Sequence, residues 1–222
     1  MAQWSKLSLI LYFKMFGNKK KLITHDGSFH TDDVFTCAMF SLMFERAGIS
    51  YKIIRTRDEE IIKTGDFVFD VGGVYDEKLN RFDHHQPGGA GKRPNGIEYS
   101  SFGLVWKRYG MELCGDLKVT EIIDKRLVAP IDAWDNGIDL VENKHETNPY
   151  FLQHIFFAML PTWQEENLNK DEIFLKCVEM AKPILSREIK VATDTVLSEN
   201  KVLSTYHDTI DKRIIILDNN YP

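Results

Sequence analysis

The stretch LITHDGSFHTDDVFTCAMFSLMFERAG, residues 22–48, decides the fold class. Its first three residues are a short apolar run that predicts a buried strand, and this strand delivers His25 at its carboxyl end. Residues 31–47 predict a helix with Thr31 as its candidate N-cap and Gly48 as its end. The body of this helix is apolar nearly all round, so we expect it to be buried against a sheet.

The same alternation continues along the chain. Residues 51–54 and 67–69 predict two more strands, and residues 58–63 predict a short helix between them. This order predicts an α/β fold, a doubly wound and mostly parallel sheet flanked by helices. Ligands bind at the carboxyl ends of such strands, where His25 and Asp70 both stand.

The second half of the chain predicts mainly helix. Ser100 or Ser101 would cap a helix that ends at Gly110, and Pro130 would interrupt the helix that follows it. Further helices are expected at 117–128, 149–160 and 171–203, the last kinked or split by Pro183, before a buried strand at 213–217. We therefore expect three regions: an N-terminal extension, poorly ordered, at 1–20; an α/β catalytic domain at 21–140; and a helical segment with a terminal strand at 141–222.

Composition narrows the class of protein. The 222 residues carry 28 basic and 33 acidic side chains, a net charge of −5, which disfavours a basic nucleic-acid binder that acts without bound cations. The three cysteines are widely spaced and odd in number, as expected for a cytoplasmic or other reducing compartment. The apolar run at 7–13 is too short to cross a bilayer, so no stable membrane insertion is expected.

Histidines and carboxylates gather where the expected elements end. Mixed imidazole and carboxylate donors suit Mn²⁺, and also Fe, Co or Zn, better than Ca²⁺. Two cations about 3.5–4 Å apart need a bridging carboxylate, and Asp70, followed by two glycines, is the natural bridge. Asp83 can orient a neighbouring imidazole. The four groups are His25-Asp26 with His30-Thr31-Asp32-Asp33, Asp70, Asp83-His84-His85, and Asp132 with Asp135.

Each group also has a structural reading. Asp32 and Asp33 can be first-turn helix charges, and Asp132 and Asp135 can be ordinary helix acids. The loop at 86–96 is rich in glycine and proline and is expected to be mobile. Its two basic residues can neutralise substrate phosphates or simply be solvated, and the serines at the next helix start can hold a phosphate or cap the helix. These candidate substrate-binding residues are Lys92, Arg93, Ser100 and Ser101.

The motifs together resemble a known family. The Asp-His-His tripeptide after an aspartate-bearing strand is similar to the DHH phosphoesterase superfamily, and the four blocks resemble its melanocyte-proliferating-gene-type exonuclease branch. The match runs from about Lys21 to the end of the chain, although relatives usually continue further after the position of Leu217, so we expect the helical C-terminal part to be truncated. The blocks are THDGSFHTDD at 24–33, DVGGVYD at 70–76, RFDHHQ at 81–86 and DAWDNG at 132–137.

The resemblance implies a manganese- or magnesium-dependent phosphoesterase with 3′-to-5′ RNA exonuclease activity. It implies two divalent cations, one held by His25, His30 and Asp70 and the other by Asp32, Asp70, His84 and Asp132. His85 would lie beside the substrate phosphate as a donor or acid, helped by Asp83, while Asp33 and Asp135 would support the ligands.

The expected function is thus metal-dependent hydrolysis of a phosphodiester, in RNA or a short oligonucleotide, by activated water. Three alternatives stay open. The first is a small-molecule phosphatase for pyrophosphate or a dinucleotide, because the acidic surface offers little to long nucleic acid. The second is an inactive, metal-stabilised binding module, and the third is a two-metal hydrolase of a non-phosphate substrate. A homodimer is compatible with the sequence.

Overall fold

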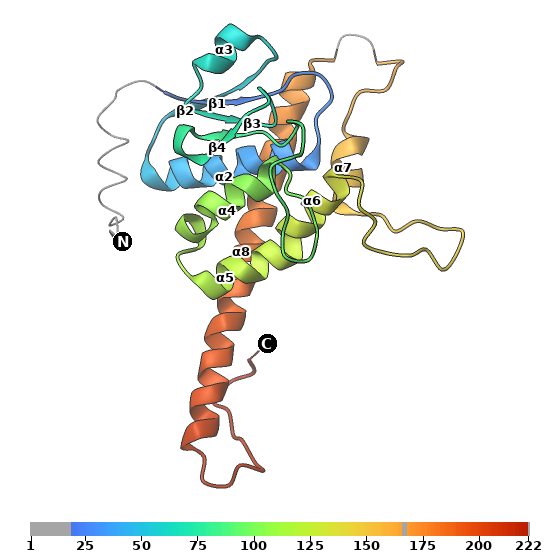
Figure 1. Ribbon diagram of the computed structural model, residues 1–222. Coiled ribbons are helices and arrows are strands. Elements are labelled where there is room, and N and C mark those ends of the chain that lie inside the picture. Colours follow the sequence, from blue (N-terminus) through green and yellow to red (C-terminus); the bar gives the residue numbers. More distant parts are fainter. Residues whose placement is uncertain (1–18, 166–167, 222) are drawn as a thin grey trace.

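The computed structural model describes residues 19–165 and 168–221. Its sheet has the strand order β2-β1-β3-β5-β4, and the strands other than β4 run parallel, while β4 pairs with β5 in the antiparallel sense (Figure 1). The predicted mostly parallel α/β sheet is therefore confirmed. The bounds are β1 (Lys20–Thr24), β2 (Tyr51–Arg55), β3 (Phe67–Phe69), β4 (Tyr75–Asp76) and β5 (Arg81–Phe82).

Helices cover the sheet and build the second half of the chain, as expected. The α-helices are α2 (Thr31–Ala47), α3 (Glu59–Lys63), α4 (Ser101–Cys114), α5 (Leu117–Ile123), α6 (Ala129–Asp135), α7 (Leu152–Ala158) and α8 (Lys170–Asp208). A 3₁₀ turn, η1 (Glu77–Leu79), joins β4 to β5, and a π-helical turn, η2 (Asp124–Val128), joins α5 to α6. Among residues 19–165 and 168–221, no helix combines the length and apolar character needed to cross a bilayer.

The core is centred on α2, which lies between the sheet and helices α4 and α8 (Figure 1). The Phe40 ring shows why: its centroid lies 4.7 Å from that of Phe67 in β3 and 5.6 Å from that of Tyr109 in α4. A smaller apolar cluster lies on the other face of the sheet, where Ile23 and Val68 pack against Ile62 of α3. Because side chains alternate along strands, one short strand can fill both clusters.

Three helix boundaries differ from the expectation. The N-cap of α2 is His30 rather than Thr31, and its backbone N–H donates to Asp33 Oδ1. Helix α4 continues through Gly110, whose missing Cβ leaves room for the Trp106 ring, and ends at Gly115 in the left-handed region. Pro130 does not break the chain's helical course, because it stands in the first turn of α6, where no N–H donor is needed.

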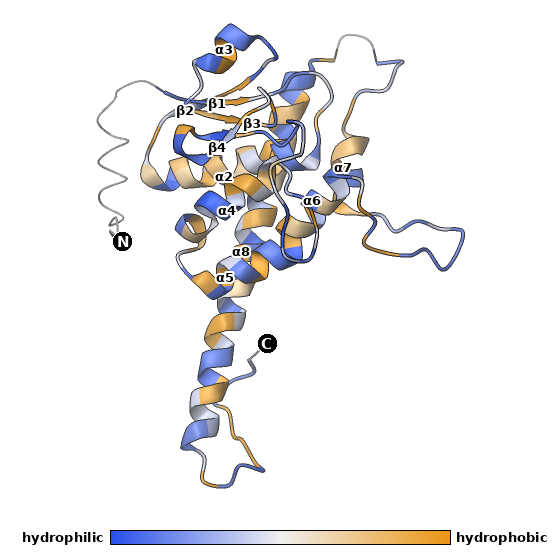
Figure 2. Cartoon of the chain, in the orientation of Figure 1, coloured by the Kyte–Doolittle hydropathy of each residue, from blue (hydrophilic) through white to orange (hydrophobic). Residues whose placement is uncertain are grey.

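The C-terminal region corrects two further expectations. Helix α8 runs without interruption past Pro183, and its first half buries Phe174 and Leu185 in the core that contains α2. Its second half projects beyond the other helices with polar and apolar residues interleaved (Figure 2). The predicted buried strand at 213–217 is wrong: the segment has no strand partner among the described residues, and Ile216 is 81% exposed.

Of the predicted N-terminal extension, residues 1–18 lie outside the described residues. The division at residues 140 and 141 stays a prediction.

Candidate metal centre

The chemistry-bearing residues lie at the carboxyl edge of the sheet. His25 follows β1, Asp70 follows β3, and Asp83 follows β5, and these three strands are neighbours. The chain leaves β1 for β2 on one side and returns to β3 on the other side, so the strand order reverses between β1 and β3. Such a switch point opens a crevice outside the strand ends, which is where open α/β sheets bind ligands.

Asp70 stands at the middle of this edge. Its φ of 56° places a residue other than glycine in the left-handed region, a strained conformation that recurs at functional sites. Its Oδ2 lies 3.1 Å from His25 Nε2, and its Oδ1 lies 3.3 Å from His84 Nε2 and 3.6 Å from His85 Nδ1. The strained backbone thus holds one carboxylate among three imidazoles.

The buried His25 ring is held from both sides. Its Nδ1 lies 2.9 Å from the Asp26 carbonyl oxygen, while its Nε2 faces Asp33 Oδ2 at 3.2 Å as well as Asp70. Burial lowers the pKa of His25, but hydrogen bonds to Asp33 and Asp70 outweigh burial and raise this pKa to about 11. The imidazolium in turn keeps the Asp70 pKa below its usual range despite burial. At neutral pH the His25 ring is therefore protonated in the metal-free protein, at a position where a cation would compete with the proton.

A second group forms where the start of α2 meets the end of α6. Asp32 Oδ2 accepts a 2.6 Å hydrogen bond from Ser101 Oγ. Asp135 lies 3.6 Å from His30 Nδ1 and 3.3 Å from His84 Nε2. Burial, followed by the negative charges of Asp32 and then Asp70, raises the pKa of Asp135 to about 10. The carboxylates of this group therefore carry more negative charge than the nearby imidazoles can neutralise.

The donors present fit divalent cations. Three sets of candidate ligand atoms lie within 4.8 Å of one another: His25 with His30 and Asp70, Asp70 with His84 and His85, and His30 with Asp32 and Asp135. Among their buried atoms, Asp32 Oδ1 has no hydrogen-bond partner among the described residues, while Asp70 Oδ2 and His84 Nε2 have only the ion-pair contacts within the group, at 3.1–3.3 Å. Buried polar atoms without partners are costly, and a cation would satisfy them. Mixed nitrogen and oxygen donors suit transition metals.

Asp132 does not join these sets, contrary to the expectation that it is a metal ligand. Its Oδ1 accepts hydrogen bonds from Ser100 Oγ at 2.5 Å and from the Gly103 N–H at 3.0 Å, and its Oδ2 pairs with Arg93 Nη1. These donors already satisfy the carboxylate. The carboxylate of α6 that lies at the centre is that of Asp135, three residues later.

Most of the residues expected to bind a substrate phosphate form hydrogen bonds or ion pairs with other side chains of the protein. Arg93 is only 7% exposed and forms ion pairs with Asp124 in η2 and Asp132 in α6. These pairs attach the loop at 86–96 to the helical part of the protein. Ser100 and Ser101 are buried, and their hydroxyls donate to Asp132 and Asp32, leaving no free group for a phosphate.

Ser100 occupies the N-cap position of α4, but its hydroxyl makes no capping bond. Lys92 is exposed and pairs with Glu98 at 2.7 Å.

Asp83 and His85 form a pair beside the centre. Asp83 Oδ1 lies 2.7 Å from His85 Nδ1 and accepts the His85 backbone N–H at 3.0 Å, while Asp83 Oδ2 accepts the Gly73 N–H at 2.6 Å. The bond to Asp83 raises the pKa of the exposed His85. One buried carboxylate therefore shapes the glycine turn after Asp70 and orients the His85 ring.

A cavity of about 440 Å³ opens onto this edge, lined by His25, Asp26, Gly27, Ser28, His30, Arg57, Asp70, Val71, Gly72, Asp83 and His85. Among these lining residues, Arg57 carries the only permanent positive charge, and its Nε lies 3.3 Å from Asp26 Oδ1. The sequence analysis did not identify Arg57 as a candidate site residue. Its position just after the second predicted strand, at the same carboxyl edge as His25 and Asp70, could have identified it.

Fold and site together define an α/β protein with an imidazole–carboxylate centre at the switch point of a parallel sheet. The family model for the MYG1 exonuclease, described as "Uncharacterised protein family (UPF0160)", matches residues 21–222. The chain belongs to this family, and the resemblance to the melanocyte-proliferating-gene-type branch is confirmed.

Curated relatives include the MYG1 exonucleases of Bos taurus and Homo sapiens, which are 32% and 31% identical to the chain over 186 residues, 72% of it. The MYG1 protein C27H6.8 of Caenorhabditis elegans is 29% identical over 221 residues, 88% of the chain. The chain spans about half the length of the mammalian relatives, 46% and 47%, and 64% of the nematode protein. No solved structure matches the chain.

The raised pKa values predict that metal binding releases protons. Near pH 7.5 the metal-free protein holds protons on Asp135 and His25, whose pKa values are about 10 and 11, and a cation must displace them. Affinity for Mn²⁺ should therefore rise as the pH rises. Titration calorimetry in two buffers of different ionisation enthalpy should show at least one proton released per binding event. Binding without proton release between pH 7 and 8 would contradict this reading.

Two neighbouring acids on α6 should respond differently to amidation. Asp135→Asn resembles the protonated acid, so the metal-free protein should keep its stability within about 0.5 kcal/mol, while Mn²⁺ affinity should fall at least ~10-fold. Asp132→Asn breaks a buried ion pair with Arg93 and should cost about 3 kcal/mol of unfolding free energy, with Mn²⁺ affinity nearly unchanged. Denaturant unfolding and metal titration measure both. The reverse pattern would make Asp132 the ligand.

Proposed function

We propose that the chain is a divalent-metal-dependent phosphodiester hydrolase, a 3′-to-5′ exonuclease that acts on RNA or short oligonucleotides. The observation that carries the proposal is the position of Asp70, whose two oxygens face imidazoles from different strand ends. A carboxylate shared in this way suits two neighbouring cations. The exonuclease names of the mammalian relatives support the reaction class, and the RNA substrate and direction rest on the resemblance found in the sequence.

The ligand set that we propose differs by one residue from the set that the sequence implied. His25, His30 and Asp70 would hold one cation, and Asp32, His84 and Asp135, with Asp70 shared, would hold the other; Asp135 replaces Asp132. Manganese is the cation that this donor set favours, with Mg²⁺, Fe, Co or Zn as alternatives. Such cations would activate water and neutralise charge on the phosphoryl oxygens.

The chain's own residues supply the rest of the chemistry. Asp83 accepts from His85 Nδ1, which leaves Nε2 of this exposed ring for the cavity that it lines. There His85 can donate a proton to the leaving oxygen. Asp33 accepts the backbone N–H of His30 through Oδ1 and faces the His25 ring through Oδ2, so it fixes the start of α2 and positions the His25 imidazole. Arg57 at the cavity can bind a phosphate oxygen, a role that the sequence reading gave to Lys92 and Arg93.

The cavity also favours a second candidate, a phosphatase for pyrophosphate or a dinucleotide. Its volume of about 440 Å³ is within the range of sites that enclose small molecules. A net charge of −5 offers little attraction to long nucleic acid. The three cysteines are free, in keeping with our proposal of a reducing compartment such as the cytoplasm.

A substrate panel tests the function directly. With Mn²⁺, the full chain should shorten 5′-labelled single-stranded RNA from its 3′ end, and Asp70→Asn should reduce kcat at least ~100-fold while the circular dichroism spectrum is kept. Asp218→Asn, in the exposed tail, is the matched control and should retain wild-type rates. Turnover of pyrophosphate or a dinucleotide in place of RNA would select the second candidate, and wild-type rates in Asp70→Asn would refute both.

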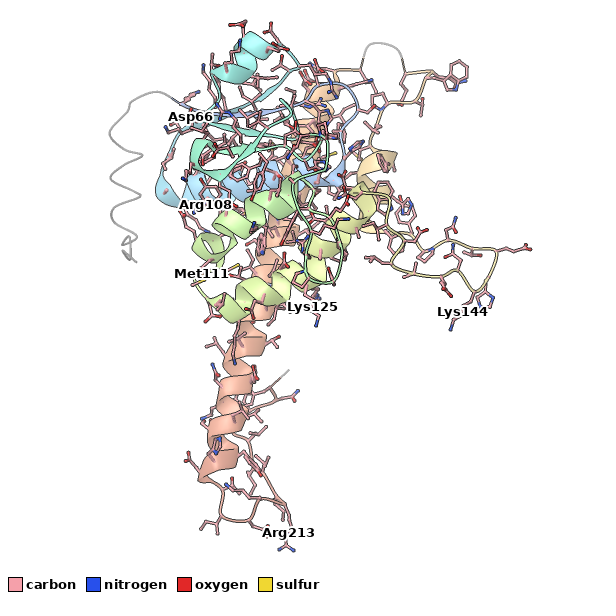
Figure 3. The ribbon with its side chains drawn as sticks, viewed as in Figure 1. Asp66, Arg108, Met111, Lys125, Lys144 and Arg213 are labelled. Atoms are coloured by element: carbon pink, nitrogen blue, oxygen red, sulfur yellow. The ribbon has the colours of Figure 1, made fainter. Side chains whose placement is uncertain are left out.

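Arg57 should contribute to substrate binding rather than to metal binding. Arg57→Ala should raise KM about 10-fold, the effect of one lost charge-assisted contact, and should flatten the salt dependence of KM, with kcat and Mn²⁺ affinity nearly unchanged. Arg213→Ala is the control, since Figure 3 places Arg213 at the far end of the C-terminal region. An unchanged KM in Arg57→Ala would remove Arg57 from the substrate site.

A further inference from the structure

An aromatic cluster lies beside the metal centre, and neither the ligand set nor the proposed chemistry uses it. It consists of Trp134 on α6 with Tyr150, Phe151, His154 and Phe157 on and before α7. The Trp134 centroid lies 5.0 Å from that of Phe157 and 6.2 Å from that of His154. The His154 ring lies 5.1 Å from Tyr150 and is stacked on Phe151 at 5.9 Å, with an interplanar angle of 18°. The five rings are thus linked by a chain of ring contacts.

This aromatic cluster is continuous with the candidate metal centre. The Phe157 ring meets the His30 ring edge-on, at 6.0 Å and 75°, and His30 also lines the cavity. Trp134 directly precedes Asp135, which lies 3.3 Å from His84. A nucleotide whose phosphate sits at the centre therefore has its base within reach of aromatic rings.

Packing of the core does not account for these rings. The residues that α7 buries are Gln153 and Phe156, and Phe156 reaches the core through Phe35, 5.9 Å away. The rings of the cluster are only partly buried, and Tyr150 is 70% exposed. Large aromatic surface left partly open to water beside a site is typical of a binding surface.

The cluster is also held in place by hydrogen bonds. Tyr150 Oη donates to the His154 carbonyl oxygen at 3.1 Å, and the Phe151 N–H donates to His154 Nδ1 at 2.8 Å. Rings that are already ordered lose little conformational entropy when a planar ligand stacks on them.

We propose that the aromatic cluster is a nucleobase-stacking surface for single-stranded nucleic acid. The proposal rests on the proposed function, because it places the scissile phosphodiester at the metal centre and the adjoining base on Trp134 and its neighbours. Aromatic side chains bind single strands in this way without reading sequence, since every base presents a flat π-face. A net charge of −5 makes such stacking more important, because the chain has little general attraction for the backbone.

The test separates base binding from backbone binding. Dissociation constants of the full chain, with Mn²⁺, are measured by anisotropy at low temperature for a labelled hexaadenylate with hydrolysis-resistant phosphorothioate linkages and for an abasic hexamer with the same backbone. Trp134→Leu and Tyr150→Ala should each weaken hexaadenylate binding roughly 5- to 140-fold, the effect expected for the loss of one stacked base. Binding of the abasic hexamer should not change, and Trp134→Phe should restore most of the affinity.

Trp163→Leu is the matched control, because Trp163 is 87% exposed and lies outside the cluster, and it should bind hexaadenylate as the wild type does. Equal weakening of both hexamers, unchanged hexaadenylate binding in both cluster variants, or no wild-type binding would each overturn the proposal. Turnover does not enter these measurements. Base-dependent binding without RNA hydrolysis would refute the proposed function alone, and hydrolysis with unaltered binding in the variants would refute the stacking surface alone.

Discussion

The candidate site depends on the electrostatics of one buried carboxylate. Asp70 brings a negative charge into an interior that already contains Asp32, Asp33 and Asp135, and like charges this close cannot all be ionised without compensation. The protein compensates with imidazoles placed at the ends of β1 and β5. Asp70 adopts the left-handed backbone conformation at the point where these imidazoles converge.

The sequence predicted the part of the fold in which local pattern and tertiary environment agree. Strand β3 and the helix after β1 were expected with nearly the observed bounds, because short apolar runs and a fully apolar helix have few alternatives. His25 and Asp70 lie at the sheet edge as expected, because each follows the end of a parallel strand and neighbouring strand ends meet. His84 lies there too, but it follows β5, a two-residue strand that the sequence analysis did not predict.

The rest required knowledge of partners that are distant in the sequence. Asp132 and Asp135 occupy one helix and look equivalent in sequence, but Arg93 and Ser100 satisfy Asp132 from other segments. Ser101 likewise could not be connected with Asp32 from the sequence. The segment 213–217 has the composition of a strand, yet a strand needs a neighbour for its backbone groups, and composition does not reveal whether one is there.

Helix α2 is enclosed by the sheet, α4 and α8; His30 is its N-cap, and Asp32 and Asp33 lie in its first turn. Because protein interiors are close-packed, α2 cannot tilt or slide unless its neighbouring elements repack. The backbone that carries these candidate ligands is consequently held in place by the core. The packing of α2 would then set the distances between its ligand atoms, and ions of different radius would fit these distances unequally. The hydrophobic core, which does not touch the ion, would in this way contribute to discrimination between metals.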